Sequence, residues 1–236
     1  MTPRVAVALS TSGLQGSVAL AVDGEIVGTH FIEEGFVHGR EIVRALDEVL
    51  GSRELGPRDV ELVCVDVGPG SFTGMRVGVT TAKTLAYAAG AKTVGVAAPD
   101  ATVRNVEGSA ELPRTVLIDA KRSEVVLVEY RVEGNATIRT GDMRIVAIDS
   151  LEETLAERSI LLGDGLAAIR DELLERRDDL TIAPEADWLP KADQVLRLGL
   201  DESAEDRFTA AEDLNPLYVR SSEPIVRRST KARNPR

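Results

Sequence analysis

The 236-residue sequence is poor in cysteine, histidine and aromatic side chains, and each scarcity excludes a class of protein. The one cysteine, Cys64, excludes an intramolecular disulfide and predicts a reducing compartment, the cytoplasm. The two histidines, His30 and His38, match no paired-histidine metal motif, so no metal site is expected from them. Because aromatic residues make up only 3% of the chain, the core must consist mainly of valine, leucine, isoleucine and alanine.

Long hydrophobic runs are also lacking, and acidic residues outnumber basic ones. No run approaches the ~20 apolar residues of a membrane helix, and the residues after Met1 show no signal-peptide pattern. We therefore expect no membrane contact. With 39 acidic and 28 basic residues the net charge is −11, and such a surface repels a phosphate backbone. The body of the chain is a poor candidate for a general nucleic-acid binder.

The last fifteen residues have the opposite charge. Residues 222–236 contain five basic residues and one acid and carry +4, which leaves −15 for the rest of the chain. Two prolines and the lack of apolar periodicity predict a disordered tail. A solvated end without a role is one interpretation, and a contact with RNA is the other.

The first half of the chain predicts an antiparallel meander followed by alternating helices and strands. Residues 5–9, 17–22 and 25–32 are typical of strands, and Asp23-Gly24 is a strong hairpin signal. A helix is expected over 38–51, a buried strand over 62–65, a glycine-rich loop over 68–74, a long helix ending at Gly90, and a strand over 93–97.

A second series of the same kind follows residues 107–113. Strands are expected at 115–118, 125–132, within 135–148 and at 159–162, and helices at 151–156, 166–174 and 191–200. We therefore predict an α/β fold of two related lobes. The predicted divisions are an N-terminal lobe over 1–107, a C-terminal lobe over 108–221 and the basic tail over 222–236.

The glycine loop has two interpretations. Glycines before a helix can hold an anion with backbone amides, but the lysine of a P-loop is absent and Gly68, Gly70 and Gly74 lack the dinucleotide spacing. The alternative is a tight turn in which Ser71 or Thr73 caps the helix.

The helix after the loop has small residues at every fourth position, which place them on one face. They are Gly74, Gly78, Ala82, Ala86 and Gly90. Two glycines inside a helix cost roughly 1 kcal/mol each relative to alanine, so close packing must offset them. Either a second chain or another element of the same lobe could pack there.

The sequence offers no convincing catalytic set. It contains no G-x-S-x-G motif for a serine nucleophile. Asp119, Glu124 and Asp164 follow strands and are candidates for Mg²⁺ ligands, but acids in turns are usually solvated or capping. Cys64 lies in an apolar run typical of an inert core residue.

One segment carries a specific resemblance. Gly68-Pro-Gly-Ser-Phe-Thr-Gly-Met-Arg-Val-Gly78 resembles the signature of the bacterial TsaB (YeaZ) family, which has also carried glycoprotease labels. The similarity extends over about residues 4–220 through Ser10-Thr-Ser12, Asp119-Ala-Lys-Arg-Ser-Glu124, Gly163-Asp-Gly165 and Pro216-Leu-Tyr-Val-Arg220.

The resemblance implies an actin/Hsp70/sugar-kinase-like (ASKHA) fold of two RNase H-like lobes. It implies a non-catalytic subunit of the complex that adds threonylcarbamoyl to N6 of adenosine 37 in tRNAs reading ANN codons. The implied partners are the catalytic paralogue TsaD, the ATPase TsaE and a second copy of the chain. Transfer RNA would be met only through that complex, with the basic tail as the one direct contact.

The resemblance also implies site residues. It assigns a partner interface to the helices after His38 and after the glycine loop: His38, Ile42, Leu46, Gly74, Met75, Gly78, Ala82 and Ala86. No tightly bound cofactor is implied, although ATP or ADP could bind at the complex interface. The residues expected to face a nucleotide or phosphate are Ser10, Thr11, Ser12, Gly70, Ser71, Gly163, Asp164 and Gly165.

Two departures from the family pattern bear on the alternatives. Ser10 replaces the usual acid of the first turn, and Gly39-Arg40 replaces Ser-Glu after His38. The first departure counts against the alternative function, an ATP-dependent phosphotransferase or ATPase of the sugar-kinase class. The sequence contains no set of residues that could bind zinc, so it gives no support to a metalloprotease.

Overall fold

The computed structural model describes residues 4–32, 38–106, 112–134 and 136–219, with the side chain of His38 left out. The first half contains β1 (Val5–Ser10), β2 (Gly16–Val22), β3 (Glu25–Ile32), α1 (His38–Gly51), β4 (Leu62–Gly68), α2 (Phe72–Ala89), β5 (Lys92–Ala97) and α3 (Ala98–Thr102). The second half contains β6 (Arg114–Asp119), β7 (Glu124–Glu133), β8 (Ala136–Arg139), β9 (Arg144–Ala147), α4 (Leu151–Thr154), β10 (Ile160–Leu162), α5 (Arg170–Arg176), β11 (Thr181–Ile182) and α6 (Ala192–Ala204).

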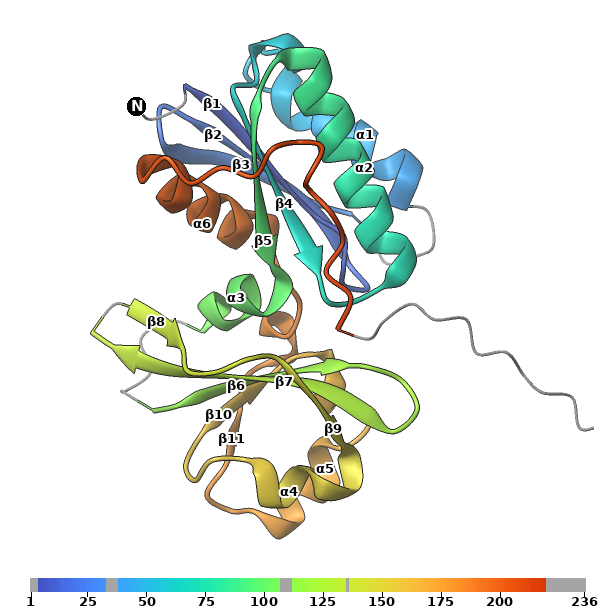
Figure 1. Cartoon of the computed structure of the whole chain (residues 1–236), viewed down its shortest axis with the longest axis vertical. Coiled ribbons are helices and arrows are strands. Elements are labelled where there is room, and N and C mark those ends of the chain that lie inside the picture. Colours follow the sequence, from blue (N-terminus) through green and yellow to red (C-terminus); the bar gives the residue numbers. More distant parts are fainter. Residues whose placement is uncertain (1–3, 33–37, 107–111, 135, 220–236) are drawn as a thin grey trace, which may run out of the picture.

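Each lobe is built on one mixed sheet, and the two sheets have the same strand order (Figure 1). The N-terminal sheet runs β3-β2-β1-β4-β5, and the C-terminal sheet runs β8-β7-β6-β10-β11, with β9 also pairing with β7. In both sheets the first three strands are antiparallel and the later strands are parallel to the central one. This repetition confirms the predicted pair of related α/β lobes.

Alternate residues of β1 face different helices. Val5, Val7 and Leu9 are buried in a cluster with α1 and α2, whereas Ala6 and Ala8 are buried in a cluster with α6. The larger side chains fill the space under two helices, and the alanines let a single helix lie close to the sheet. Figure 1 accordingly shows α1 and α2 on one face of the N-terminal sheet and α6 on the other.

Helix α6 corrects the predicted division between the lobes. It follows the C-terminal strands in the sequence, but its residues Val195 and Leu196 are fully buried in the core of the N-terminal sheet. Gly199 lies so close to β4 that a Cβ atom there would be 2.0 Å from Cys64 Sγ. Helix α6 and the segment that follows it to Leu217 therefore pack on the N-terminal lobe, so the predicted C-terminal lobe over 108–221 was too long.

A polar cluster joins the two lobes. The Tyr130 hydroxyl on β7 donates to Asp100 Oδ1 on α3 at 2.7 Å, and Arg139 Nε on β8 donates to the same oxygen at 3.1 Å. Burial of Tyr130 raises the pKa of its hydroxyl above its usual range, so it remains a donor. The lobes are thus held together by directional bonds as well as by apolar packing.

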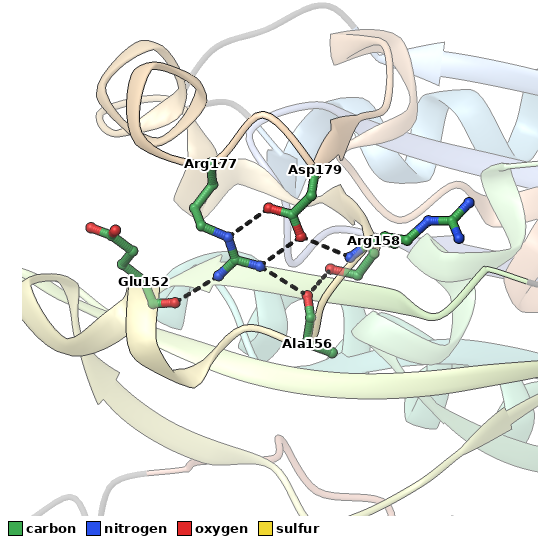
Figure 2. Close-up of polar contacts among 6 residues, drawn as sticks. Glu152, Ala156, Arg158, Arg177 and Asp179 are labelled. Carbon is green, nitrogen blue, oxygen red and sulfur yellow. Dashed lines mark hydrogen bonds and ion pairs between the residues drawn. The ribbon is translucent and has the colours of Figure 1, made fainter.

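A second polar cluster connects α4 with the residues that follow α5 in the C-terminal lobe (Figure 2). Arg177, which follows α5, donates to both carboxylate oxygens of Asp179, at 2.7 and 2.9 Å, and to the Glu152 carbonyl oxygen of α4 at 2.9 Å. Asp179 also accepts the Arg158 amide at 2.9 Å. The hydrogen bonds from Arg177 and from this amide lower the pKa of Asp179.

Replacing Arg177 with glutamine is expected to lower the thermal unfolding midpoint at pH 7. Because the folded pKa of Asp179 is depressed, its share of the stability is present above the ordinary aspartate pKa of about 3.9 and is lost as the pH falls below it. The difference from the parent should therefore shrink in that acidic range. Arg131→Gln, at an exposed ion pair, is the control; a difference that is the same at pH 7 and at pH 3 would contradict the assignment.

Candidate functional site

The candidate site is a cleft of about 670 Å³ between the lobes. Its walls come from the turn after β1, the glycine loop, the start of α2, the hairpin between β6 and β7, and residues 217–219. Four of the residues predicted to face a nucleotide line it: Ser12, Gly70, Ser71 and Asp164. Ser10, Thr11, Gly163 and Gly165 lie behind the wall and are buried.

The turn after β1 is fixed by a buried carboxylate that the sequence analysis missed. Asp66 at the end of β4 is fully buried, and its Oδ2 accepts the amides of Thr11 at 3.2 Å and Ser12 at 3.0 Å. The Ser10 hydroxyl lies 3.0 Å from the same oxygen, and the Gly68 amide donates to Oδ1 at 2.8 Å. Burial raises the pKa of Asp66, and these donors stabilise its ionised form. Ser10 therefore binds protein atoms in the position where the family usually has an acid.

The glycines of the loop are explained by close approach to this turn. A Cβ atom at Gly70 would lie 2.4 Å from the Ser12 carbonyl oxygen, and one at Gly74 would lie 1.9 Å from the Thr11 carbonyl oxygen. Ser71 caps α2 by accepting the Gly74 amide at 3.2 Å, as the turn interpretation predicted. The small residues thus serve contact between loop and turn, and their presence is no sign of a phosphate cradle.

On the opposite wall of the cleft a glycine again allows two backbone segments to approach closely. Gly163 has φ of 114°, and a Cβ atom there would lie 2.1 Å from the Leu117 carbonyl oxygen of β6. This turn holds Asp164, whose Oδ1 accepts the Asp119 amide at 3.0 Å. Burial raises the pKa of Asp164, and the charge of Asp119 adds to this effect.

The second carboxylate of the cleft is already paired. Burial alone would raise the pKa of Asp119, but hydrogen bonds from the Lys121 side chain and amide hold it below its ordinary value. Lys121 in turn has a raised pKa because it donates to Asp119. The two acids and one lysine give the cleft a net negative charge. In the described residues no cluster of histidine, cysteine, aspartate or glutamate suits a metal ion.

The residues assigned to a partner interface lie inside the N-terminal lobe. Seven of them are buried: Ile42, Leu46, Gly74, Met75, Gly78, Ala82 and Ala86. At Gly78 a Cβ atom would lie 2.3 Å from Thr11 Oγ1, so the small-residue face of α2 packs on its own sheet. This is the intramolecular alternative of the sequence analysis. The eighth residue, His38, begins α1, and its side chain lies outside the described part.

The features expected of a partner interface lie on the outward face of α2 and not on its buried small-residue face. Along one stripe of the outward face Thr73, Val77, Thr80, Thr84 and Tyr87 are exposed or half-buried and uncharged, and the exposed Arg76 and half-buried Lys83 lie beside the stripe. The residues of the stripe alternate at intervals of four and three residues, which is the spacing of a helix–helix seam. Tyr87 is 92% exposed, a large side chain that none of the described residues covers.

The comparisons with known proteins agree with this geometry. A family model described as "TsaD: tRNA N6-adenosine threonylcarbamoyltransferase" matches residues 36–167, more than half of the chain. The chain belongs to this family. Named relatives place it with the TsaB proteins, which confirms the resemblance found in residues 68–78.

Two of these relatives are tRNA threonylcarbamoyladenosine biosynthesis proteins TsaB. The one from Escherichia coli is 26% identical over 220 residues, covering 91% of this chain and 94% of that protein. The one from Haemophilus influenzae is 28% identical over 225 residues, covering 91% and 92%. The chain thus spans nearly the whole length of both.

The fold is shared with solved structures. YeaZ from Pseudomonas aeruginosa superposes with a TM-score of 0.77 at 22% identity, covering 91% of this chain and 99% of that one. Together with the repeated strand order, this shows that the chain has the YeaZ fold, with two related α/β lobes as predicted. No helix within the described residues is both long and apolar enough to cross a membrane.

Proposed function

We propose that this chain is the non-catalytic TsaB subunit of tRNA threonylcarbamoyladenosine biosynthesis and that it binds a TsaD-type catalytic subunit. Family membership supports the process. The observation that carries the binding role is the outward face of α2, which combines a helix–helix seam with an almost fully exposed Tyr87. A helix of the partner can pack along this uncharged seam, with Arg76 and Lys83 at its border.

The neighbouring helix contributes in a different way. On α1 the exposed positions include Val43, 56% exposed, beside charged residues such as Arg44 and Asp47. A surface with an uncharged centre and a charged border is typical of protein interfaces. The interface predicted for α1 and α2 is therefore proposed again, with its residues moved to the opposite face of α2.

Thr80→Arg tests this surface. An arginine at the centre of the seam would be buried without a partner, so binding to the TsaD-type subunit of the same genome should weaken by about 30-fold or more. The measurement is a binding titration with both purified subunits. Thr29→Arg is the matched control, because Thr29 is exposed on β3 and pairs with Ala19, whose side chain faces α6.

The experiment distinguishes an error in the proposed interface from an error in the proposed function. If Thr80→Arg binds the partner as tightly as Thr29→Arg does, the α2 surface is not the interface. If the parent chain does not bind the TsaD-type subunit at all, the proposed function itself is wrong.

We also propose the remaining partners that the resemblance implies. A TsaE-type ATPase would join the pair, ATP or ADP would bind where the subunits meet, and two copies of the chain would use the α2 seam when the partner is absent. Thr80→Arg should then also convert any homodimer to monomer in light scattering. A tRNA contact by residues 222–236 stays a prediction, because these residues lie outside the described part.

The alternative function, an ATP-dependent phosphotransferase or ATPase, has no support in the cleft. A phosphate there would meet Asp119 and Asp164, while Lys121 is engaged by Asp119. Nothing in the comparisons favours it either.

A further inference from the structure

The described part of the chain ends inside the interlobe cleft. After α6, residues 205–219 run back over the N-terminal lobe, where the Thr209 amide donates to the Thr93 carbonyl oxygen at 2.9 Å. Leu214 is buried in the lobe's core, and the Leu217 amide donates to the Val67 carbonyl oxygen at 2.7 Å. Figure 1 shows this segment, in orange-red, passing beside α2 down to the gap between the lobes. Residue 220 therefore follows directly from the cleft wall.

Tyr218 anchors this end to the start of α2. Arg76 Nε donates to the Tyr218 hydroxyl at 3.1 Å, and the Tyr218 ring lies 5.6 Å from that of Phe72. The Arg76 guanidinium stacks 3.9 Å from the centre of the Phe72 ring. Because these contacts fix Tyr218, the point at which the chain continues past Val219 is fixed as well.

The cleft suits a segment that is both apolar and basic. Leu14, 66% exposed, Phe72, 50% exposed, and the half-buried Ile145 offer apolar surface. Among the residues that line the cleft only Asp119, Lys121 and Asp164 are charged, which gives a net negative charge. An apolar wall without an occupant is unfavourable in water, and the acids favour a cation beside it.

The residues that follow have this composition. Pro224-Ile-Val-Arg-Arg228 places two β-branched apolar side chains before two arginines. Residue 225 is six positions beyond Val219 and can reach about 20 Å from it in an extended chain. The tether also supplies an effective concentration in the millimolar range.

We propose that residues 225–228 bind in the interlobe cleft of their own chain. Ile225 and Val226 cover the apolar wall, and the two arginines lie toward Asp164, because Lys121 already engages Asp119. The interlobe cleft is then occupied by the protein itself. This inference does not depend on the proposed function.

Thiol protection tests the docking in the full chain. Leu14→Cys introduces a thiol at the cleft, and the native Cys64 does not compete because it is buried and burial raises the pKa of its thiol. Its alkylation rate by a maleimide is measured with the native tail and with Ile225→Asp and Val226→Asp together. With a docked native tail, the thiol should react about tenfold more slowly than in the substituted chain.

A matched thiol and an RNA measurement complete the experiment. Tyr87→Cys, which is exposed on α2 away from the cleft, should react at the same rate with either tail. Equal rates at the Leu14→Cys position with the two tails would overturn the proposal. Equal rates together with a tail-dependent gel shift of tRNA would instead assign the tail to RNA.

Discussion

Replacing Gly78 with leucine is expected to unfold the N-terminal lobe. Even the first side-chain atom would lie 2.3 Å from Thr11 Oγ1, far inside contact distance. Thr11 cannot move away, because its hydroxyl donates to the Gly74 carbonyl oxygen at 2.8 Å and its amide donates to Asp66. Helix α2 must therefore leave the sheet to accommodate the leucine. The free energy of unfolding should fall by about 4 kcal/mol or more, measured by urea denaturation.

This expectation is opposite to the one that follows from the partner interface implied by the family resemblance. If the small residues of α2 faced a partner, Gly78→Leu would abolish pairing and leave a folded monomer. Ala88→Leu is the matched control, because Ala88 is exposed on the same helix and has room for the larger side chain. It should leave the urea midpoint within about 0.5 kcal/mol of the parent's stability. A Gly78→Leu variant as stable as Ala88→Leu would show that the face is not packed as described.

Features set by neighbouring residues could be predicted from the sequence. The Asp23-Gly24 hairpin, α1 over 38–51 and the end of α2 at Gly90 were all confirmed. Each depends on a turn or a hydrophobic period that lies within a few residues of the chain. The repeated order of helices and strands then sufficed for the two-lobed fold.

The lobe to which α6 belongs could not be predicted in this way. Its apolar stripe shows that one face is buried but not which sheet buries it, since this choice is made across more than 100 residues of sequence. One signal was present in β1, where Ala6 and Ala8 alternate with Val5, Val7 and Leu9. A strand with a small-residue face requires a closely packed helix on that face, and the structure supplies α6.

Several residues predicted to face a nucleotide lie together in one cleft, but the sequence did not show what each of them contacts. Ser12, Ser71 and Asp164 do line one cleft, although they come from both lobes. The sequence shows small residues in a helix, but not whether they face a sheet or a partner. Asp66 was missed because a single acid after an apolar strand has no local signature. Its importance comes from donors more than 50 residues away.

Asp66→Ala is expected to be the most damaging change at the site itself. It would remove the acceptor of four donors, three of them backbone amides, from a position with no access to water. A buried donor left without a partner costs about 1–3 kcal/mol. Partial rearrangement of the turn would recover some of that cost, so the unfolding free energy should fall by about 3 kcal/mol or more.

Asp59→Ala separates this network from the ordinary loss of a carboxylate. Asp59 accepts a single backbone amide, that of Gly56 at 2.7 Å, and it is exposed, so water can replace the lost acceptor. Its alanine variant should unfold at nearly the parent's urea concentration. If Asp66→Ala cost no more than Asp59→Ala, the turn after β1 would be held by packing alone. The glycines of the loop would then be the main determinants of the cleft wall, because Gly70 and Gly74 contact that turn from the other side.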